Sequence, residues 1–406
     1  MQKGGEILFR INFILIFNFT IIVSSYSQEP DFKQYFSKYT TENDSIINSK
    51  SLSSFFAKLK SVETSDSLQT INILHIGDSH IQADILTREI RNSLQNRFGN
   101  AGRGLVFPFR ITRSNESFDF HSSTNSSWKW ETVRNRKRNF EPGIAGASMQ
   151  CNDDIFTFEM KLTNRDSLDN SFRKVKLICR NDSNGLLAFV TDKNDLSRQL
   201  IAFSGDTIYE TKLNNLTDRI EIQSVGNVLI DGLVLENEKK GIQYHVVGIN
   251  GAHYADYNKS KTFFAEMPFL QPDLILISLG TNEGVNAGVS SQVVVNETDK
   301  MIQNIRLESI DAPIVIITPF DNFYHRKKNN RYLSVVRNGL LTAAEKNNIA
   351  CMDMYGISGG FGSVAAWRRQ KLITSDGIHY TISGYKLQGK MIYNTLINSY
   401  SNYASR

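Results

Sequence analysis

The chain has 406 residues, a formal net charge of +5 and three cysteines. Its length exceeds that of one ordinary domain, and its small, dispersed positive charge excludes the concentrated basic face that nucleic-acid binding requires. Three cysteines in so long a chain exclude a small disulfide-stapled scaffold.

Residues 1–27 have the pattern of a secretory signal peptide. Lys3 and Arg10 supply a positive start, INFILIFNFTIIV (11–23) is an apolar stretch, and SSYS (24–27) provides small residues before Gln28. The apolar stretch is short for a membrane span, which needs about 20 residues. We therefore expect cleavage, export to the periplasm or the extracellular space, and no stable membrane insertion afterwards.

The first strong structural signal is ILHIGDSHIQAD (73–84). INILHIG (71–77) is a continuous apolar strand, and the apolar residues at 86, 90 and 94 recur at the spacing of one helix face. Gly77, Asp78, Ser79 and His80 therefore lie where a strand turns into a helix.

Residues 106–240 have a different pattern. Short alternating segments such as FTFEMKL, KVKLICR and RIEIQSV are separated by polar turns such as NDSNG, which is typical of a β-sandwich. Cys151 and Cys179 fall in this region, and sequence cannot decide whether they pair. RNRKR (134–138) is the densest basic run, and it indicates either a solvated loop or a contact with an anionic polymer.

Two tryptophans of this region, Trp128 and Trp130 in SSWKWE, alternate so that both rings face the same side of a strand. They could stack on sugar rings, or they could be core residues of the sandwich. Both interpretations stay open at this point.

Alternation of strands and helices returns after residue 244. DLILISLG (273–280) and APIVIITPF (312–320) are uniformly apolar, as expected for parallel strands covered on both faces. The sequence therefore predicts one α/β domain, formed by residues 28–105 and 241–406, that is interrupted by the β-sandwich at 106–240.

Two chemistries could use the tetrad at 77–80. Asp78 and His80 could bind a catalytic metal as a D-x-H pair, but the later acidic loop GTNEG (280–284) contains no histidine and no further ligand cluster is visible. An incomplete ligand set does not favour a metal site. No metal or other cofactor is therefore implied.

The alternative is a nucleophilic serine, and the chain contains its partners. Ser79 would stand at the carboxyl end of a parallel strand, where open α/β sheets place their sites. SDGIHYTISGY (375–385) supplies His379 as the base, with Asp376 three residues earlier to orient it. The N–H groups of Ser79 and Gly251 and the side chain of Asn282 are candidate oxyanion donors.

These stretches resemble four blocks of the SGNH, or GDSL-type, hydrolases: GDSH (77–80), GINGA (248–252), GTNE (280–283) and DGIH (376–379). The resemblance covers roughly residues 70–105 and 241–400, and it implies a flavodoxin-like three-layer fold. It makes Ser79, Gly251, Asn282 and His379 the name-giving positions, with Asp376 as the orienting acid.

The sequence departs from the family pattern at two positions. His80 replaces the usual leucine, and Glu283 replaces the common aspartate. Neither position carries the core chemistry. His80 either lines the acyl pocket or is a satisfied buried histidine, and the second interpretation is favoured because His379 already fills the role of base.

The β insertion is similar in placement to the carbohydrate-binding-module-like insertion of bacterial peptidoglycan O-acetylesterases. The expected function is a secreted serine esterase that removes O-acetyl groups from an envelope or extracellular polysaccharide, with peptidoglycan as one candidate. The alternatives are a lipase, arylesterase or thioesterase with the same triad, and a non-catalytic glycan-binding protein.

Overall fold

The computed structural model describes residues 46–65, 69–151, 153, 155–163, 169–181, 187–202, 207–225 and 228–405. The predicted signal peptide at 1–27 lies outside these residues. Within the described ranges, no helix combines the length and apolar character that a bilayer-spanning segment needs.

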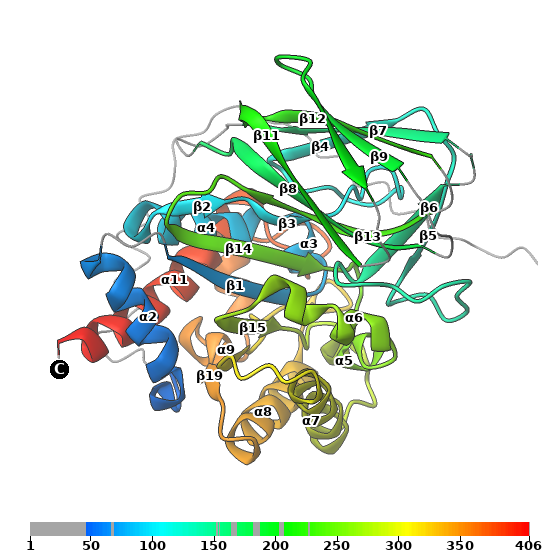
Figure 1. The fold of residues 1–406 in the computed structure, drawn as a ribbon. Coiled ribbons are helices and arrows are strands. Elements are labelled where there is room, and N and C mark those ends of the chain that lie inside the picture. The colour runs from blue at the N-terminus through cyan, green and yellow to red at the C-terminus, as the bar shows by residue number, and fades with distance from the viewer. Residues whose placement is uncertain are drawn as a thin grey trace, which may run out of the picture.

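A six-stranded parallel sheet forms the centre of the α/β domain, as predicted (Figure 1). Its strand order is β19-β16-β15-β1-β14-β2. The strands are β1 (Thr70–Gly77), β2 (Asn100–Gly102), β14 (Gly241–Gly248), β15 (Leu274–Ser278), β16 (Ile314–Ile317) and β19 (Ala350–Met352). Most of their residues are buried because helices or other strands cover both faces.

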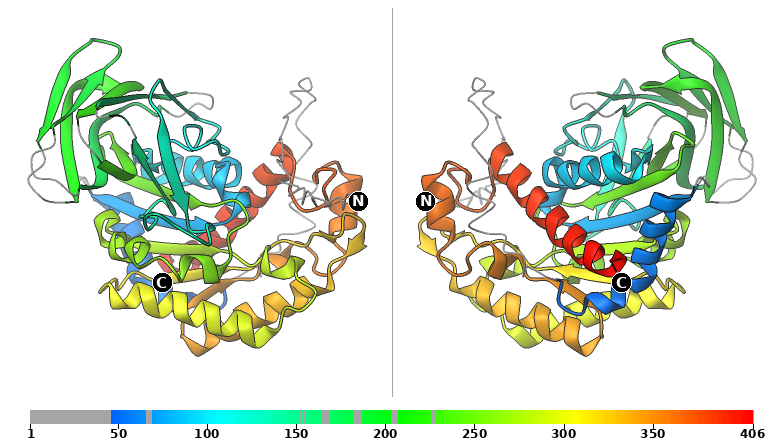
Figure 2. Two further views of the ribbon diagram at one scale, coloured as in Figure 1. Left: turned by 90° about the vertical axis from the view of Figure 1, so that its right-hand side faces the viewer. Right: turned by 90° about the vertical axis from the view of Figure 1, so that its left-hand side faces the viewer.

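Long helices cover both faces of this sheet (Figure 2). One face packs against α2 (Ser53–Thr64), α4 (Ile85–Phe98) and α11 (Ile382–Ala404). The other packs against α7 (Ser291–Leu307) and α8 (Arg331–Lys346). This arrangement confirms the predicted three-layer fold.

Short elements connect these layers. They are η1 (Ser49–Leu52), α3 (Ser79–Gln82), α5 (Tyr254–Tyr257), α6 (Lys261–Ala265), η2 (Met267–Leu270), η3 (Glu283–Val285), α9 (Met354–Ile357), α10 (Val364–Arg369) and the hairpin of β17 (Phe323–Tyr324) and β18 (Lys328–Asn329).

The predicted insertion is a sandwich of two antiparallel sheets. One has the order β10-β9-β12-β7-β4, and the other β11-β8-β13-β6-β5 with β3 also paired to β13. The strands are β3 (Gly104–Val106), β4 (Phe120–Thr124), β5 (Trp128–Thr132), β6 (Ala147–Cys151), β7 (Ile155–Leu162), β8 (Phe172–Asn181), β9 (Leu187–Asp192), β10 (Arg198–Ala202), β11 (Ile208–Thr217), β12 (Arg219–Val225) and β13 (Val228–Glu236).

The insertion shares its core with the α/β domain. Leu105 and Ile230 of the sandwich belong to the same buried cluster as Val247 and Tyr257 of the α/β domain. The chain leaves the parallel sheet between β2 and β3 and returns between β13 and β14. The insertion is therefore packed against the catalytic domain rather than connected to it by a flexible tether.

The cysteines are buried free thiols. Cys151 lies on β6 and Cys179 on β8, and β13 runs between these two strands. The pairing that the sequence left open is therefore not formed.

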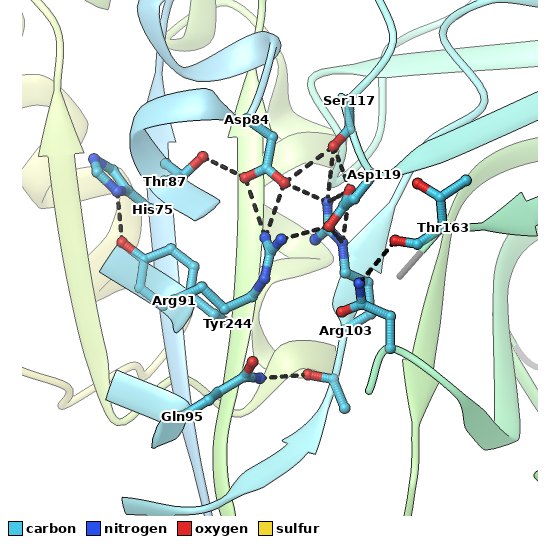
Figure 3. A network of polar contacts seen from close by, with 12 residues as sticks. His75, Asp84, Thr87, Arg91, Gln95, Arg103, Ser117, Asp119, Thr163 and Tyr244 are labelled. Carbon is cyan, nitrogen blue, oxygen red and sulfur yellow. Dashed lines mark hydrogen bonds and ion pairs between the residues drawn. The ribbon is translucent and has the colours of Figure 1, made fainter. Parts of the chain in front are cut away.

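A buried ionic network joins the two parts of the protein (Figure 3). Arg91 on α4 contacts Asp84 at 2.9 Å and Asp119 at 2.6 Å, while Arg103 contacts the same two carboxylates at 2.6 and 3.1 Å. All four side chains are at most 2% exposed. Burial alone would raise the pKa of Asp119, but Arg103 and Arg91 hold it well below its ordinary value.

Removing one charge from this network should destabilise the fold. We expect Asp119→Asn to lower the free energy of unfolding by about 3 kcal/mol, because it leaves buried guanidinium groups undercompensated. Denaturant unfolding at neutral pH measures the change. Because the folded-state pKa of Asp119 is depressed, its stabilisation is present above about pH 4 and fades as the pH falls, so the variant should lose less stability on acidification.

The exposed Asp311 provides a matched control. Asp311→Asn should change the free energy of unfolding by less than about 0.5 kcal/mol. Equal effects of the two substitutions would contradict the assigned importance of the network.

Candidate active site

Three strands end together at one edge of the parallel sheet. Gly77, the last residue of β1, is in register with Gly248 of β14 on one side and with Ser278 of β15 on the other. The loops that follow these strands carry Ser79, Gly251 and Asn282. The topology therefore brings the predicted nucleophile and oxyanion donors to one place.

The turn from β1 into α3 is tightly packed. A Cβ on Gly77 would lie 2.3 Å from Ile81 Cγ1 and 2.9 Å from the carbonyl oxygen of Ser278, so only glycine fits there. Asp78 caps α3, because its Oδ1 accepts the His80 N–H at 3.0 Å. These contacts place Ser79 at the first position of the helix.

Ser79, His379 and Asp376 form a continuous hydrogen-bonded chain. Ser79 Oγ lies 2.9 Å from His379 Nε2, and His379 Nδ1 lies 2.7 Å from Asp376 Oδ2. The other carboxylate oxygen, Oδ1, accepts the Ile378 and His379 N–H groups and the Thr374 hydroxyl at 2.8 to 2.9 Å. Burial alone would raise the pKa of Asp376, but the hydrogen bonds from His379 and Ile378 hold it well below its ordinary value.

This order of partners fixes the tautomer of His379. An ionised carboxylate only accepts hydrogen bonds, so the proton resides on Nδ1, between the ring and Asp376. Nε2 then presents its lone pair to the Ser79 hydroxyl. The arrangement allows proton removal from Ser79 and stabilisation of the resulting imidazolium.

The two remaining predicted donors lie on neighbouring loops. Gly251 has a φ of +73°, which favours glycine, and no hydrogen bond within the described part of the chain uses its N–H. Asn282 Nδ2 donates to the carbonyl oxygen of Ala252 at 2.9 Å and lies 3.3 Å from Asp78 Oδ2. Asn282 therefore contacts the immediate neighbours of both Gly251 and Ser79.

Gln82 is a site residue that the sequence reasoning missed. Its Oε1 accepts the Asn250 N–H at 2.6 Å, while its Nε2 donates to Ser114 Oγ at 2.7 Å and to the Asn115 carbonyl at 2.9 Å. Gln82 thus connects the helix of the nucleophile, the loop of Gly251 and the β insertion. The only sequence signal for this role of Gln82 was that it is a polar residue on the same helical turn as Ser79.

His80 lies behind the base, and within the described part of the chain its Nδ1 has a hydrogen-bond partner whereas its buried Nε2 has none. Its Nδ1 lies 3.0 Å from the Tyr385 hydroxyl, and its ring centroid lies 5.2 Å from that of His379. Burial lowers the pKa of His80 to about 3. His80 also lines a small cavity with Phe320 and Tyr380.

Asp78 and His80, the pair considered as metal ligands, already have other partners. Asp78 is engaged with the His80 N–H and Asn282, and His80 with Tyr385. Among the described residues, no three histidine, cysteine, aspartate or glutamate side chains gather in a way that could hold a metal ion.

The two tryptophans lie two residues apart on β5 and pack against the same buried cluster, but they differ in burial. Trp128 is buried, with its ring centroid 4.8 Å from that of Phe156, and its indole N–H donates to Thr124 Oγ1. The structure therefore favours the core interpretation for Trp128, which has no ring face for a sugar. Trp130 is half-buried, with the Arg113 guanidinium 5.6 Å from its ring centroid, and its sugar contact stays a prediction.

A family model matches part of the chain. Residues 227–387 match the model of the GDSL-like Lipase/Acylhydrolase family. The matched span contains Gly251, Asn282, Asp376 and His379, whereas Ser79 precedes it on the far side of the insertion. No curated protein sequence matches the chain.

Several solved structures are similar to the chain. A structure titled "Peptidoglycan O-acetylesterase in action, 5 min" has a TM-score of 0.75 and 21% identity, and the match covers 91% of this chain and 99% of that one. A family two carbohydrate esterase from Cellvibrio japonicus has a TM-score of 0.28 and 10% identity, covering 70% and 98% of the two chains. A lipase/acylhydrolase from Enterococcus faecalis has a TM-score of 0.30 and 18% identity, covering 39% and 76%.

At these identities the likeness is one of fold, and the first of these three matches extends over both the α/β domain and the insertion at a TM-score of 0.75. Together with the family match, it supports an ester-hydrolysing serine hydrolase.

Loss of the nucleophile should abolish turnover while the fold is retained. We expect Ser79→Ala to lower kcat on 4-nitrophenyl acetate by at least about a thousandfold, as triad losses typically do. Circular dichroism should be unchanged, and a chelator should have no effect on the wild type. Ser401→Ala, at an exposed position of α11, is the control. Chelator-sensitive turnover that added metal restores would refute the serine mechanism.

Asn282 should act on the transition state rather than on substrate binding. Asn282→Ala should lower kcat by about a hundredfold to a thousandfold, the usual loss for one oxyanion donor, with little change in KM. Steady-state kinetics on the same ester measure both. Asn286→Ala, at an exposed position of the same loop, should resemble the wild type. A raised KM with an unchanged kcat for Asn282→Ala would remove it from the oxyanion hole.

Proposed function

We propose that the protein is an exported serine esterase that removes O-acetyl groups from an envelope or extracellular polysaccharide, peptidoglycan among them. The observation that carries the proposal is the chain from Ser79 Oγ through His379 to Asp376, set beside an insertion that borders the same loops. Export rests on the signal sequence at 1–27.

The reaction follows from the positions of these groups. His379 Nε2 removes the Ser79 proton while Ser79 Oγ attacks the acetyl carbonyl, and the N–H groups of Ser79 and Gly251 and the Asn282 amide stabilise the oxyanion. His379 then protonates the departing sugar hydroxyl, leaving acetyl-Ser79. A water molecule that His379 deprotonates releases acetate and restores the serine.

The polymeric substrate is supported by the similarity in fold over both parts of the chain. The match to the structure titled as a peptidoglycan O-acetylesterase includes the β insertion, because it covers 91% of this chain. In this protein the insertion contacts Gln82, beside the nucleophile, through Ser114 and Asn115. An acetylated chain bound at the active site would therefore also meet the insertion.

Release of acetate from defined polymers tests the proposal. Purified protein should release acetate from O-acetylated peptidoglycan or another acetylated polysaccharide, while Ser79→Ala should release none. 4-Nitrophenyl acetate and 4-nitrophenyl decanoate should be compared in parallel, and the acetate ester should be preferred. Preference for the decanoate with no acetate released from any polymer would support a lipase instead.

A further inference from the structure

The β insertion places an arginine on the loop of the predicted oxyanion hole. Arg134 follows β5, and its side chain lies against Gly251. A Cβ built on Gly251 would lie 3.4 Å from Arg134 Nε and 3.6 Å from Nη2. The guanidinium therefore borders the site where the acyl group reacts.

The guanidinium is anchored at one nitrogen and open at its other edge. Nη1 donates to Asp256 Oδ2 at 3.2 Å, and the side chain is 44% exposed. Within the described part of the chain, no hydrogen bond uses Nε or Nη2. These two N–H groups form the fork that binds a carboxylate with two parallel hydrogen bonds.

Positive and negative side chains both lie near this edge. One carboxylate, that of Asp256, is shared among Arg134, Lys259 Nζ at 3.6 Å and His253 Nδ1 at 3.1 Å. The carboxyl group of Glu283 accepts the Tyr254 N–H at 2.9 Å. Arg134 therefore shares its carboxylate partner with a lysine and a histidine.

A second arginine of the insertion, Arg113, adjoins the segment that contacts Gln82. Ser114 and Asn115 contact Gln82, which also accepts the Asn250 N–H. The preceding residue, Arg113, is exposed, and its guanidinium lies over the half-buried ring of Trp130. The segment of the insertion that contacts Gln82 and the segment that contacts Gly251 therefore each contain an exposed arginine.

We propose that Arg134 is a specificity residue that binds a substrate carboxylate close to the ester. The substrate class is then an acetylated glycan that carries a carboxylate on or next to the acetylated sugar. This inference rests on the proposed esterase function and narrows it. In the basic run at 134–138, Arg134 would then bind the substrate carboxylate. Arg138, at the other end of the run, is half-buried and donates to the carbonyl of Asn135.

The test compares one polymer with its carboxylates present and neutralised. O-acetylated peptidoglycan is used before and after amidation of its carboxyl groups, and acetate release gives kcat/KM for each form. The wild type should prefer the native form by about tenfold or more, the range for a hydrogen bond to a charged group. Arg134→Gln should bring the ratio of the two forms close to one, and Arg134→Lys should restore part of it.

The ratio of kcat/KM for the native polymer to kcat/KM for the amidated polymer separates carboxylate recognition from structural damage. Structural damage lowers both values equally and leaves their ratio unchanged. Arg136→Gln removes an exposed arginine of the same loop and should keep the wild-type ratio. An Arg134→Gln variant that retains the wild-type preference, or a wild type without preference, would overturn the proposal.

Failure of the proposed substrate gives a different result. If neither form of peptidoglycan releases acetate while 4-nitrophenyl acetate is hydrolysed, peptidoglycan is the wrong polymer. Arg134 is then tested by inhibition of 4-nitrophenyl acetate turnover with oligogalacturonate and its methyl ester. Inhibition by the free acid alone, lost in Arg134→Gln, supports carboxylate binding at this residue, and its absence refutes it.

Discussion

The position of the insertion depends on four charged side chains that have no access to water. Asp84 follows α3, Arg91 lies on α4, Arg103 lies between β2 and β3, and Asp119 directly precedes β4 of the sandwich (Figure 3). A buried charge without its partner costs several kcal/mol, so these groups must keep their mutual positions. Because Asp84 follows Ser79 by five residues, the same network also restrains the corner that carries the nucleophile.

This restraint explains how an insertion can take part in a site whose chemistry belongs to another domain. The α/β domain alone supplies Ser79, His379 and Asp376. The insertion supplies contacts around them, through Ser114 to Gln82 and through Arg134 to Asp256. A triad of this kind can hydrolyse many esters, so discrimination among substrates has to come from groups around it. In this protein those groups are held by a shared core and a buried ionic network rather than by a flexible linker.

The sequence predicted the features that depend on local pattern. The apolar strands at 71–77 and 273–280, the sandwich and the three-residue spacing of Asp376 and His379 all follow from short stretches. Gln82, Arg134 and the burial of Trp128 could not be predicted, because each depends on how two distant segments pack. Gln82 meets Asn250 across 168 residues and Arg134 meets Asp256 across 122. The sequence explained Gly77 by the sharp turn between strand and helix. In the structure, glycine is required there because Ile81 and the Ser278 carbonyl approach too closely for a side chain.

Asp376 and Asp78 show how different surroundings shift the pKa of the same residue type in opposite directions. Asp376 accepts four hydrogen bonds from groups of its own loop, which hold its pKa low and keep it ionised against the His379 imidazolium. Burial raises the pKa of Asp78 to about 7, against the opposing effect of the His80 N–H. Its Oδ2 lies beside Asn282 Nδ2, close to where negative charge would develop on the substrate. Burial therefore has the larger effect on the pKa of Asp78, whereas the hydrogen bonds together have the larger effect on that of Asp376. Separation of two carboxyl pKa values by burial and hydrogen bonding is a recurring device of acid–base catalysis.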